Sequence, residues 1–241
     1  MRYLASFSGG KDSAATIILA HEFHIPLDEV IYSQVMFSDT ISGELPEHVN
    51  FIKNVAFPLF EEWGYKTVVV QAKTNYLKIF NRPVSRSLKP DRIGMQAGFP
   101  MAGKCSISRD CKIKPINDYI KRFGNEEIAQ YIGIAVDETE RLQRIGNNKR
   151  SLLAEFGYTE EMAMKKAEEY GLLSPCYSYS SRNGCWFCPN CGLQELMYLR
   201  NHYRELWNYI LKLEERDGLV GKVWNTRNKM SIHEMERRLG G

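Results

Sequence analysis

A glycine-rich turn between a short apolar run and a helical run constrains this chain more than any other feature. The turn is Ser8–Ser13 (SGGKDS); Arg2–Phe7 before it is typical of a strand, and Asp12–Phe23 after it is typical of a helix. This order gathers backbone N–H groups and the positive end of a helix dipole at one point, which suits a phosphate chain. The adjacent Gly9 and Gly10 permit positive φ and a close approach to an anion.

The side chains of the turn fit the same purpose. Lys11 adds a mobile cation, and Ser8 and Ser13 add hydroxyl donors. The turn is not a Walker A loop, because no glycine stands five residues before Gly10, and Asp12 follows the lysine where that loop has Ser or Thr. A purely structural alternative is an N-capped helix after a glycine turn, since Ser and Asp favour helix starts. We predict nucleotide binding at this turn.

Length and composition bound the class of protein. The 241 residues, 44% of them hydrophobic, can bury one large core or one domain with a smaller appendage. No uncharged apolar run reaches the roughly 18 residues that a membrane span needs, and the first strand begins at once. We therefore expect no membrane segment, no signal peptide and a cytoplasmic location. A net charge of +3 neither requires nor forbids a polyanionic partner.

Strand and helix signals alternate along the chain, which favours βαβ units in a parallel sheet. Further strands are predicted at Glu29–Phe37, Lys66–Gln71 and Ile128–Ala135, of which Lys66–Gln71 is expected to be buried on both faces. The predicted fold is α/β: a Rossmann-like parallel sheet with helices on both faces and a small, metal-stapled C-terminal helical appendage. Its expected domains are a nucleotide-binding part, 1–171, and the cysteine site with the C-terminal helices, 172–241. Residues 82–104 are expected to form a long loop or lid. The expected helices are Pro46–Trp63 (kinked or split at Pro58), Lys112–Phe123, Thr159–Tyr170, Gln194–Arg216 and Ser231–Leu239.

Four of the six cysteines are spaced like metal ligands. They form C-x8-C-x2-C-x2-C, in which two interlocked turns bring three thiolates within reach of one ion and a fourth stands upstream. Structural zinc suits a closed four-thiolate site, and a [4Fe–4S] cluster would also accept four thiolates. Buried thiols without metal are the alternative. Cys105 and Cys111 receive no assigned role. The four predicted ligands are Cys176, Cys185, Cys188 and Cys191.

Several short motifs occur in an order that carries a family resemblance. They are SFSGGKDS from Ser6, FSDT from Phe37 with Pro46 and Glu47 after it, CKIKPI from Cys111, GIAVDE from Gly133 with Arg141 after it, and LSP from Leu173 ahead of GCWFCP from Gly184. The chain thereby resembles the phosphoadenosine-phosphosulfate (PAPS) reductase-like branch of the adenine nucleotide α-hydrolase superfamily. That group includes ATP pyrophosphatases with a pyrophosphate (PP) loop.

The resemblance implies a nucleotide site. The Ser8–Ser13 loop would hold the phosphates of ATP, or of PAPS, and Asp12 or Asp39 would hold Mg²⁺. Separately, the cysteine spacing is similar to the zinc site of 7-cyano-7-deazaguanine synthase. The expected catalytic residues are Lys11, Asp12 and Arg141; the expected nucleotide-binding residues are Ser8, Gly9, Gly10, Lys11, Asp12, Ser13, Asp39, Lys112 and Gly133.

The implied reaction splits ATP into AMP and pyrophosphate and adenylates an acceptor, which a nitrogen or sulfur nucleophile then attacks. The acceptor would be a nucleobase, tRNA or DNA, with a possible sulfur donor. One alternative is a PAPS or adenylylsulfate reductase or a sulfotransferase, but PAPS reductases end in a cysteine motif, and no cysteine follows Cys191. The other is a zinc-containing nucleic-acid-binding protein without turnover. Its basic and aromatic surface would comprise Lys104, Arg109, Lys112, Lys114, Lys149, Arg150, Trp186 and Phe187.

Overall fold

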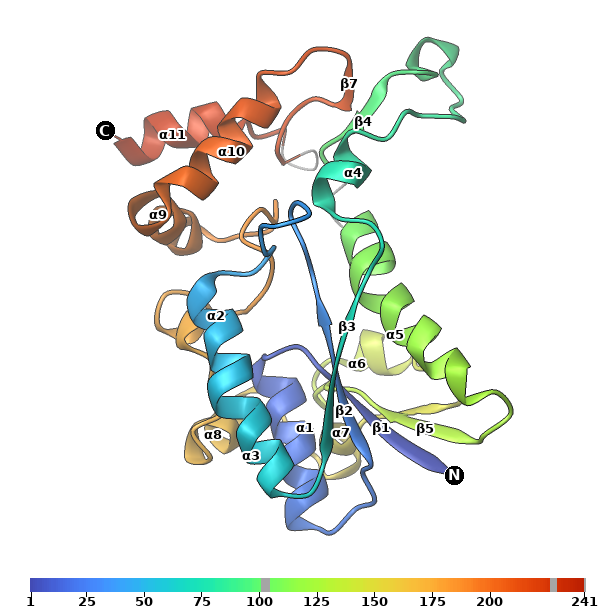
Figure 1. Ribbon diagram of the computed structural model, residues 1–241. Helices are drawn as coiled ribbons and strands as arrows, with labels where there is room; N and C mark the ends of the chain where they lie inside the picture. The colour runs from blue at the N-terminus through green and yellow to red at the C-terminus, as the bar shows by residue number, and fades with distance from the viewer. Residues whose placement is uncertain (101–104, 226–228, 241) are drawn as a thin grey trace. The chain divides into compact units, whose positions relative to one another are not determined.

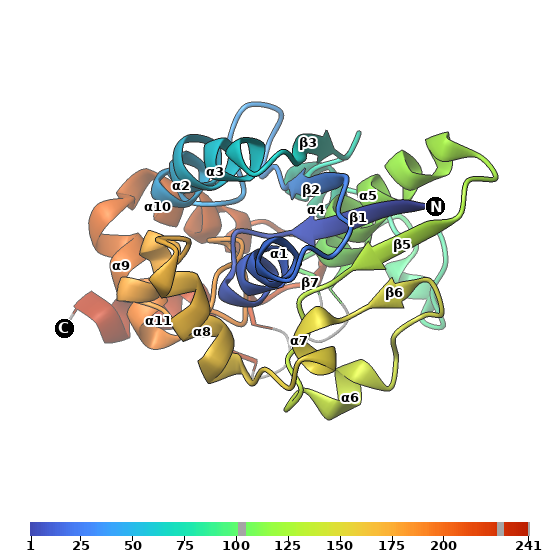
Figure 2. The same cartoon turned by 90° about the horizontal axis from the view of Figure 1, so that it is seen from below.

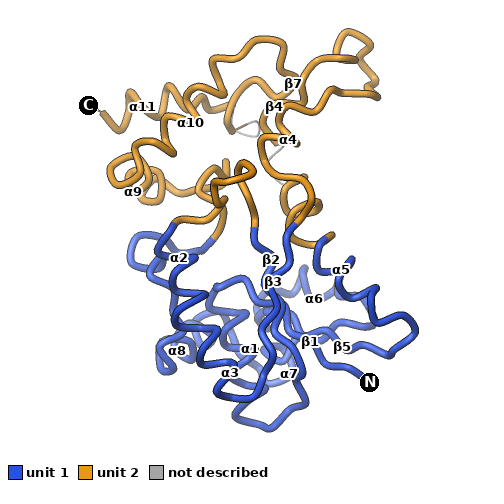
Figure 3. Tube along the Cα trace, viewed as in Figure 1, with its two compact units in different colours: residues 1–34, 46–71, 115–183 blue, residues 35–45, 72–114, 184–241 orange. Residues whose placement is uncertain are grey.

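The computed structural model describes residues 1–100, 105–225 and 229–240. Their contacts divide the chain into two units (Figure 3). The first unit comprises Met1–Gln34, Pro46–Gln71 and Pro115–Asn183; the second comprises Val35–Leu45, Ala72–Lys114 and Gly184–Gly241. The predicted division at residue 171 follows chain order, whereas these units are interleaved, because two earlier segments pack with the C-terminal part.

A five-stranded parallel sheet forms the centre of the first unit, which confirms the predicted α/β fold class (Figure 1). Its strand order is β3-β2-β1-β5-β6. Tyr32, Phe7 and Tyr131 are buried side chains of the three inner strands. The strands are β1 (Arg2–Phe7), β2 (Glu29–Gln34), β3 (Lys66–Gln71), β5 (Ile128–Tyr131) and β6 (Lys149–Arg150).

Helices cover both faces of this sheet. α1, α3 and α8 lie on one side of the strands and α5 on the other (Figures 1 and 2). The apolar side of α1, with Ala14, Ile17 and Ile18 fully buried, packs into the main core. The helices of this unit are α1 (Lys11–Glu22), α2 (Pro46–Phe51), α3 (Phe57–Glu62), α5 (Lys114–Ile120), α6 (Thr139–Leu142), α7 (Leu152–Glu155) and α8 (Glu160–Glu169), with 3₁₀ turns at Lys121–Phe123 and Pro175–Ser178.

The second unit is mainly helical, with a core of closely packed aromatic rings. The rings of Phe37 and Trp186 lie 4.6 Å apart, and those of Tyr76 and Phe187 lie 4.2 Å apart. The elements of this unit are α4 (Tyr76–Phe80), a 3₁₀ turn (Pro90–Arg92), β4 (Gln96–Gly98), a π-helical turn (Ser108–Ile113), α9 (Leu193–His202), α10 (Arg204–Glu214), β7 (Leu219–Gly221) and α11 (Ile232–Gly240). β4 pairs in parallel with β7, so the predicted loop 82–104 contains a short strand; its residues 101–104 lie outside the described part.

Four predicted elements need correction. The expected strand Ile128–Ala135 ends at Tyr131, as β5. Among the described residues, β3 pairs with β2 alone and is an edge strand, and Val69 is 48% exposed, so burial on both faces was wrong. The expected strand Glu29–Phe37 ends at Gln34, because the next residues turn back and the Phe37 amide donates to the Ile41 carbonyl. The expected helix Gln194–Arg216 is two helices, broken at Tyr203, whose backbone is non-helical (φ −132°, ψ 56°).

The helix predicted at Pro46–Trp63 is interrupted, as expected, but upstream of Pro58. A π-helical turn, Ile52–Ala56, joins α2 to α3, and Pro58 stands in the first turn of α3, where no intrahelical N–H is lost. Among the described residues, none of the helices has the length and apolar character needed to cross a bilayer.

Candidate functional site

The Ser8–Ser13 loop lies at the point where the strand order reverses. From β1 the chain continues outward through β2 and β3, and it then returns to place β5 on the other side of β1. In an open parallel sheet, the carboxyl ends of the strands at such a switch point are where ligands bind. The loop follows β1 directly, and Gly133 stands two residues after β5.

Gly133 packs against the first turn of α1. A Cβ at this position would lie 2.6 Å from both the Asp12 carbonyl carbon and the Ser13 amide nitrogen. These are backbone atoms, which cannot move aside as a flexible side chain can. Packing therefore explains why a glycine stands at position 133: the segment after β5 approaches the start of α1 too closely for a side chain. Its predicted contact with the nucleotide stays a prediction.

Gly9 has the left-handed conformation that a glycine turn was expected to use. Its φ is +73°, and the buried ring of His48 lies against its Cα, where a Cβ would be 2.5 Å from His48 Cε1. Gly10 has φ −90° and is the N-cap residue of α1. A glycine has no side chain to cap a helix, so the alternative of a Ser- or Asp-capped helix start is not what the chain builds. The amides of the first helical turn instead remain directed outward from the helix.

Two donors hold the carbonyl oxygen of Ser8. It accepts from Asn183 Nδ2 at 2.8 Å and from His48 Nε2 at 3.2 Å. Because a carbonyl only accepts, this contact assigns the imidazole proton to Nε2, and His48 Nδ1 then accepts from the Ser174 hydroxyl at 2.7 Å. Both ring nitrogens are thus engaged in fixing the loop. These two hydrogen bonds hold the Ser8 carbonyl oxygen in place where the chain enters the glycine turn.

Hydroxyl groups bind the loop amides. The Ser8 amide donates to Ser13 Oγ at 3.1 Å, and Ser13 Oγ donates to the Gly10 carbonyl at 2.9 Å. The Lys11 amide donates to the Tyr177 hydroxyl at 3.0 Å. An incoming phosphate oxygen would replace the Tyr177 hydroxyl at this amide, since each N–H makes one strong hydrogen bond.

Lys11 is not the mobile cation that the sequence suggested. Its side chain is almost buried, and its Nζ lies 2.9 Å from an Asp12 oxygen and 2.9 Å from Glu160 Oε1. Burial lowers the pKa of the Lys11 ammonium, but its bonds to Glu160 and Asp12 outweigh burial and hold that pKa above the ordinary value. Burial also raises the pKa of Asp12, against the opposing influence of Lys11. The loop therefore contains a charged ammonium bound between two carboxyl groups.

The predicted charged residues after β5 bind one another. Arg141 pairs with Glu138, which also accepts from the Ala135 amide at 3.2 Å. Asp137 accepts from the amide of Glu160, 3.2 Å away, at the start of α8. The same helix supplies the Lys11 partner, so these acidic groups and the loop belong to one connected region of the first unit.

Asp39 and Lys112, predicted to contact the nucleotide, belong to the second unit. Asp39 accepts from Lys78 Nζ at 2.6 Å and from Asn75 Nδ2 at 2.9 Å. Lys112 Nζ lies 3.6 Å from the buried carboxylate of Glu44. Their roles toward a nucleotide stay predictions.

The predicted cysteine ligands are divided between the units, with Cys176 in the first and the other three in the second. Consecutive turns connect those three, since the Cys188 amide donates to the Cys185 carbonyl at 3.0 Å and the Cys191 amide to the Cys188 carbonyl at 3.1 Å. Burial raises the pKa of the Cys185 thiol to about 12, although nearby Lys112 lowers it. Across the described residues, however, His, Cys, Asp and Glu side chains form no group of three or more that could hold a metal ion. Metal binding at the four cysteines stays a prediction.

The aromatic part of the predicted nucleic-acid surface is wrong, because Trp186 and Phe187 are each only 3% exposed and form the core of the second unit. Arg109 and Arg150 are paired with Asp110 and Glu155. Lys104 of the same predicted surface lies outside the described residues.

Sequence reasoning missed four residues of the loop's surroundings. They reach the loop from distant positions, up to 175 residues away in the case of Asn183. A weak signal existed for one of them, since a polar side chain directly follows the Pro46–Glu47 motif. The four residues are His48, Glu160, Tyr177 and Asn183.

Comparisons with known proteins give little beyond this geometry. No protein-family model matches the chain, and no curated protein matches it. Among solved structures, it is similar to the U34-tRNA thiolase NcsA from Methanococcus maripaludis with its [4Fe–4S] cluster, with a TM-score of 0.44 and 15% identity over 99% of this chain and 81% of that chain. A likeness at that TM-score carries no argument, so the interpretation below rests on the sheet and the loop.

Proposed function

We propose that this protein binds ATP at the Ser8–Ser13 loop and transfers its adenylyl group to an acceptor, with release of pyrophosphate. The observation that supports this most is the position of the loop. A glycine turn with positive φ at Gly9 precedes α1 at the switch point of a parallel sheet, and the N-cap residue, Gly10, has no side chain that could cap the helix. Outward-directed amides and a helix dipole at this place favour a polyanion.

In the proposed reaction, an oxygen of the acceptor attacks the α-phosphorus of ATP. The bond from that phosphorus to the bridging oxygen of the β-phosphate breaks, and pyrophosphate leaves with the electron pair. A nitrogen or sulfur nucleophile then displaces AMP from the activated acceptor. The acceptor class that we propose is a nucleobase, in tRNA or DNA.

Each residue of the loop has a role in this scheme. The Lys11 ammonium and the loop amides neutralise charge on the departing pyrophosphate, which is the electrostatic contribution that dominates phosphoryl chemistry. Asp12 supplies a carboxylate of the type that Mg²⁺ prefers, and it is the residue that would hold this cation beside the phosphates. Arg141 would orient the acceptor from the segment after β5. PAPS, which carries the same adenine nucleotide unit, is the alternative ligand.

Binding of a triphosphate requires Lys11 to exchange partners. Its Nζ is bound to Asp12 and Glu160, both within 3.0 Å. A phosphate oxygen must therefore bind the Lys11 ammonium at least as strongly as the half-exposed Glu160 carboxylate does. Because the Glu160 carboxylate is half-exposed, water can solvate it once a phosphate oxygen has taken its place at Lys11.

The test has a binding arm and a product arm. Titration calorimetry with ATP and Mg²⁺, and separately with PAPS, measures binding; chromatography of the nucleotides after incubation with candidate acceptors measures products. We expect AMP and pyrophosphate, with binding and turnover both lost in Lys11→Ala. Lys165→Ala is the matched control, because Lys165 is an exposed lysine of α8 that pairs with Glu161. ADP with orthophosphate as the products would refute adenylyl transfer.

A further inference from the structure

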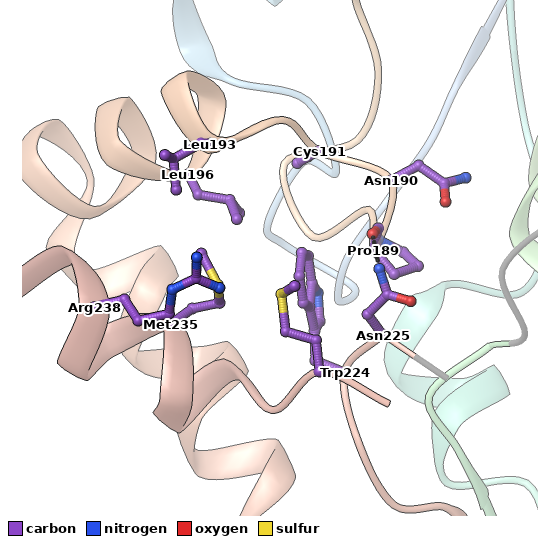
Figure 4. A pocket seen from close by; sticks show the side chains of 10 residues that line it. Pro189, Asn190, Cys191, Leu193, Leu196, Trp224, Asn225, Met235 and Arg238 are labelled. Carbon is purple, nitrogen blue, oxygen red and sulfur yellow. Dashed lines mark hydrogen bonds between the residues drawn. The ribbon is translucent and has the colours of Figure 1, made fainter. Parts of the chain in front are cut away.

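The second unit contains a pocket of about 500 Å³ that the scheme above does not use (Figure 4). Leu196 of α9, Met235 of α11 and Trp224 form its apolar wall. Each of these side chains is at most 3% exposed, so the wall is firmly packed. The size and lining fall within the range of small-molecule sites, which combine an apolar wall with a few polar groups.

Two hydrogen bonds fix the pocket's floor. The Trp224 indole N–H donates to the Phe187 carbonyl at 3.3 Å, and Asn225 Nδ2 donates to the Pro189 carbonyl at 2.7 Å. Asn190 stands at the rim and is exposed. The pocket thus combines an aromatic and aliphatic wall with the exposed amide side chain of Asn190 at its rim. Flat heteroaromatic rings match this combination, because their faces stack on apolar groups and their edges exchange hydrogen bonds with Asn.

A second pocket, also of about 500 Å³, adjoins the first and shares Met230 and Arg238 with it. Its lining includes the exposed Arg237 and Arg238 near the end of α11, together with one acidic residue, Glu234. A Glu234 oxygen accepts from the Ser231 amide at 3.1 Å, as part of the start of α11. The lining therefore carries two positive charges against one negative charge.

Glu236, which lies between Glu234 and Arg237 in the sequence, does not neutralise the arginines of the second pocket. Glu236 is bound by Arg200 at 2.9 Å and by Arg204 at 2.8 Å, and it also accepts from the Trp207 indole N–H at 2.6 Å. Its carboxylate oxygens are therefore bonded to side chains of α9 and α10. Arginine forks match phosphate oxygens well, so the second pocket suits a phosphate group.

We propose that the two pockets together bind one nucleotide unit of a single-stranded nucleic acid, with the base in the first pocket and the phosphate at Arg237 and Arg238 in the second. The nucleotide-binding property itself does not depend on ATP chemistry. RNA and DNA offer the same base and phosphate, so the experiment includes both.

The experiment measures fluorescence anisotropy of labelled single-stranded RNA and DNA oligonucleotides of mixed sequence with the full chain, without ATP. The first variant is Arg237→Gln/Arg238→Gln. Its matched control, Lys212→Gln/Lys222→Gln, removes the same two charges from exposed residues that line neither pocket. We expect the arginine variant to weaken binding about tenfold or more and the control less than about threefold.

A second variant tests the apolar pocket without threatening the fold. Leu193 lines the first pocket and is 53% exposed at the first position of α9, where an acidic residue suits the helix dipole. We expect Leu193→Asp to keep the thermal stability and to lose at least about fivefold in affinity, by charge repulsion and loss of apolar contact. A free nucleoside monophosphate should compete with the oligonucleotide.

The outcomes separate this proposal from the ATP proposal. If neither oligonucleotide binds, or if the arginine variant and its lysine control weaken binding equally, the nucleotide pocket is refuted. An ATP titration of the same preparation reports on the Ser8–Ser13 loop independently. Stronger binding of RNA or of DNA identifies which polymer the site takes.

Discussion

Replacing Gly9 by alanine tests the geometry of the loop directly. Gly9 has φ +73°, and a Cβ there would lie 2.5 Å from His48 Cε1 and 2.9 Å from Ile52 Cδ1. Left-handed backbone costs an L-residue about 1–2 kcal/mol. Forcing a methyl group into a packed interior costs about 1–3 kcal/mol. We therefore expect Gly9→Ala to lower the free energy of unfolding by about 2–5 kcal/mol.

The control for the backbone contribution is Gly64→Ala. Gly64 also has positive φ, +89°, but no heavy atom of the described residues lies within 4 Å of a Cβ built there. This variant should lose only about 1–2 kcal/mol. Urea denaturation followed by circular dichroism measures both, and a thermal scan should show a fall in Tm of about 2–4 °C per kcal/mol for a chain of this length.

A double variant isolates the contact with His48. Gly9→Ala/His48→Ala removes the ring that the new methyl group meets, so the steric cost should be recovered in part while the backbone cost remains. We expect a coupling free energy of about 1–3 kcal/mol between the two positions. Additive effects of the single variants, or a Gly9→Ala variant no less stable than Gly64→Ala, would refute this description of the loop.

Three further predictions concern charge and metal. Glu160→Gln should tighten ATP binding about two- to tenfold in calorimetry, because the Lys11 ammonium loses a carboxylate that competes with the phosphates. Glu161→Gln on the same helix should leave the ATP affinity unchanged. Weaker binding in Glu160→Gln would contradict this prediction. Burial opposes ionisation of Glu236, but hydrogen bonds from Arg204, Arg200 and Trp207 lower its pKa from 4.5 to about 2. The unfolded chain binds this proton first as the pH falls, so the free energy of unfolding should decline between about pH 4.5 and pH 2. In Glu236→Gln the urea midpoint should depend less steeply on pH in this window. An unchanged pH dependence would show that Glu236 does not contribute to acid unfolding. If the predicted cysteines bind zinc or an iron–sulfur cluster, elemental analysis should find the metal in the purified protein, and Cys188→Ser should lose it while Cys111→Ser retains it; protein that is free of metal when isolated anaerobically would refute the site.

The sequence was sufficient for the elements whose signals are local. β1 was predicted at the observed residues and α1 within one residue, because an apolar run, a glycine turn and a helical stripe follow one another directly. The two-residue strand β6 is too short to carry a pattern. The break between α9 and α10 at Tyr203 has no Gly or Pro to mark it. An edge position cannot be read from the composition of β3 either, since it depends on which strands pair.

The candidate site shows the same division between local and distant information. Positive φ at a glycine follows from local chemistry, and the sequence predicted that such a conformation would be used. The identity of the groups around the loop depends on pairings such as that of Ser8 with His48, 40 residues away. Burial of Lys11 between two carboxyl groups also depends on Glu160, 149 residues away. Charge and mobility at a loop lysine are therefore tertiary properties, and the sequence motif specifies only the lysine itself.

The environments of Gly9 and Gly10 indicate different requirements for two adjacent glycines. At Gly9 both the backbone conformation and the ring of His48 exclude a side chain. At Gly10 the backbone is ordinary, and the three heavy atoms nearest to a Cβ would all belong to the end of the flexible Asn183 side chain, with Oδ1 at 2.6 Å. Gly10→Ala should therefore fold nearly normally while displacing Asn183 from the Ser8 carbonyl. If the bound carbonyl matters for the nucleotide, this variant should lose ATP affinity at nearly unchanged stability, and Asn183→Ala should reproduce the loss; unchanged affinity in both would show that His48 alone suffices to hold the loop.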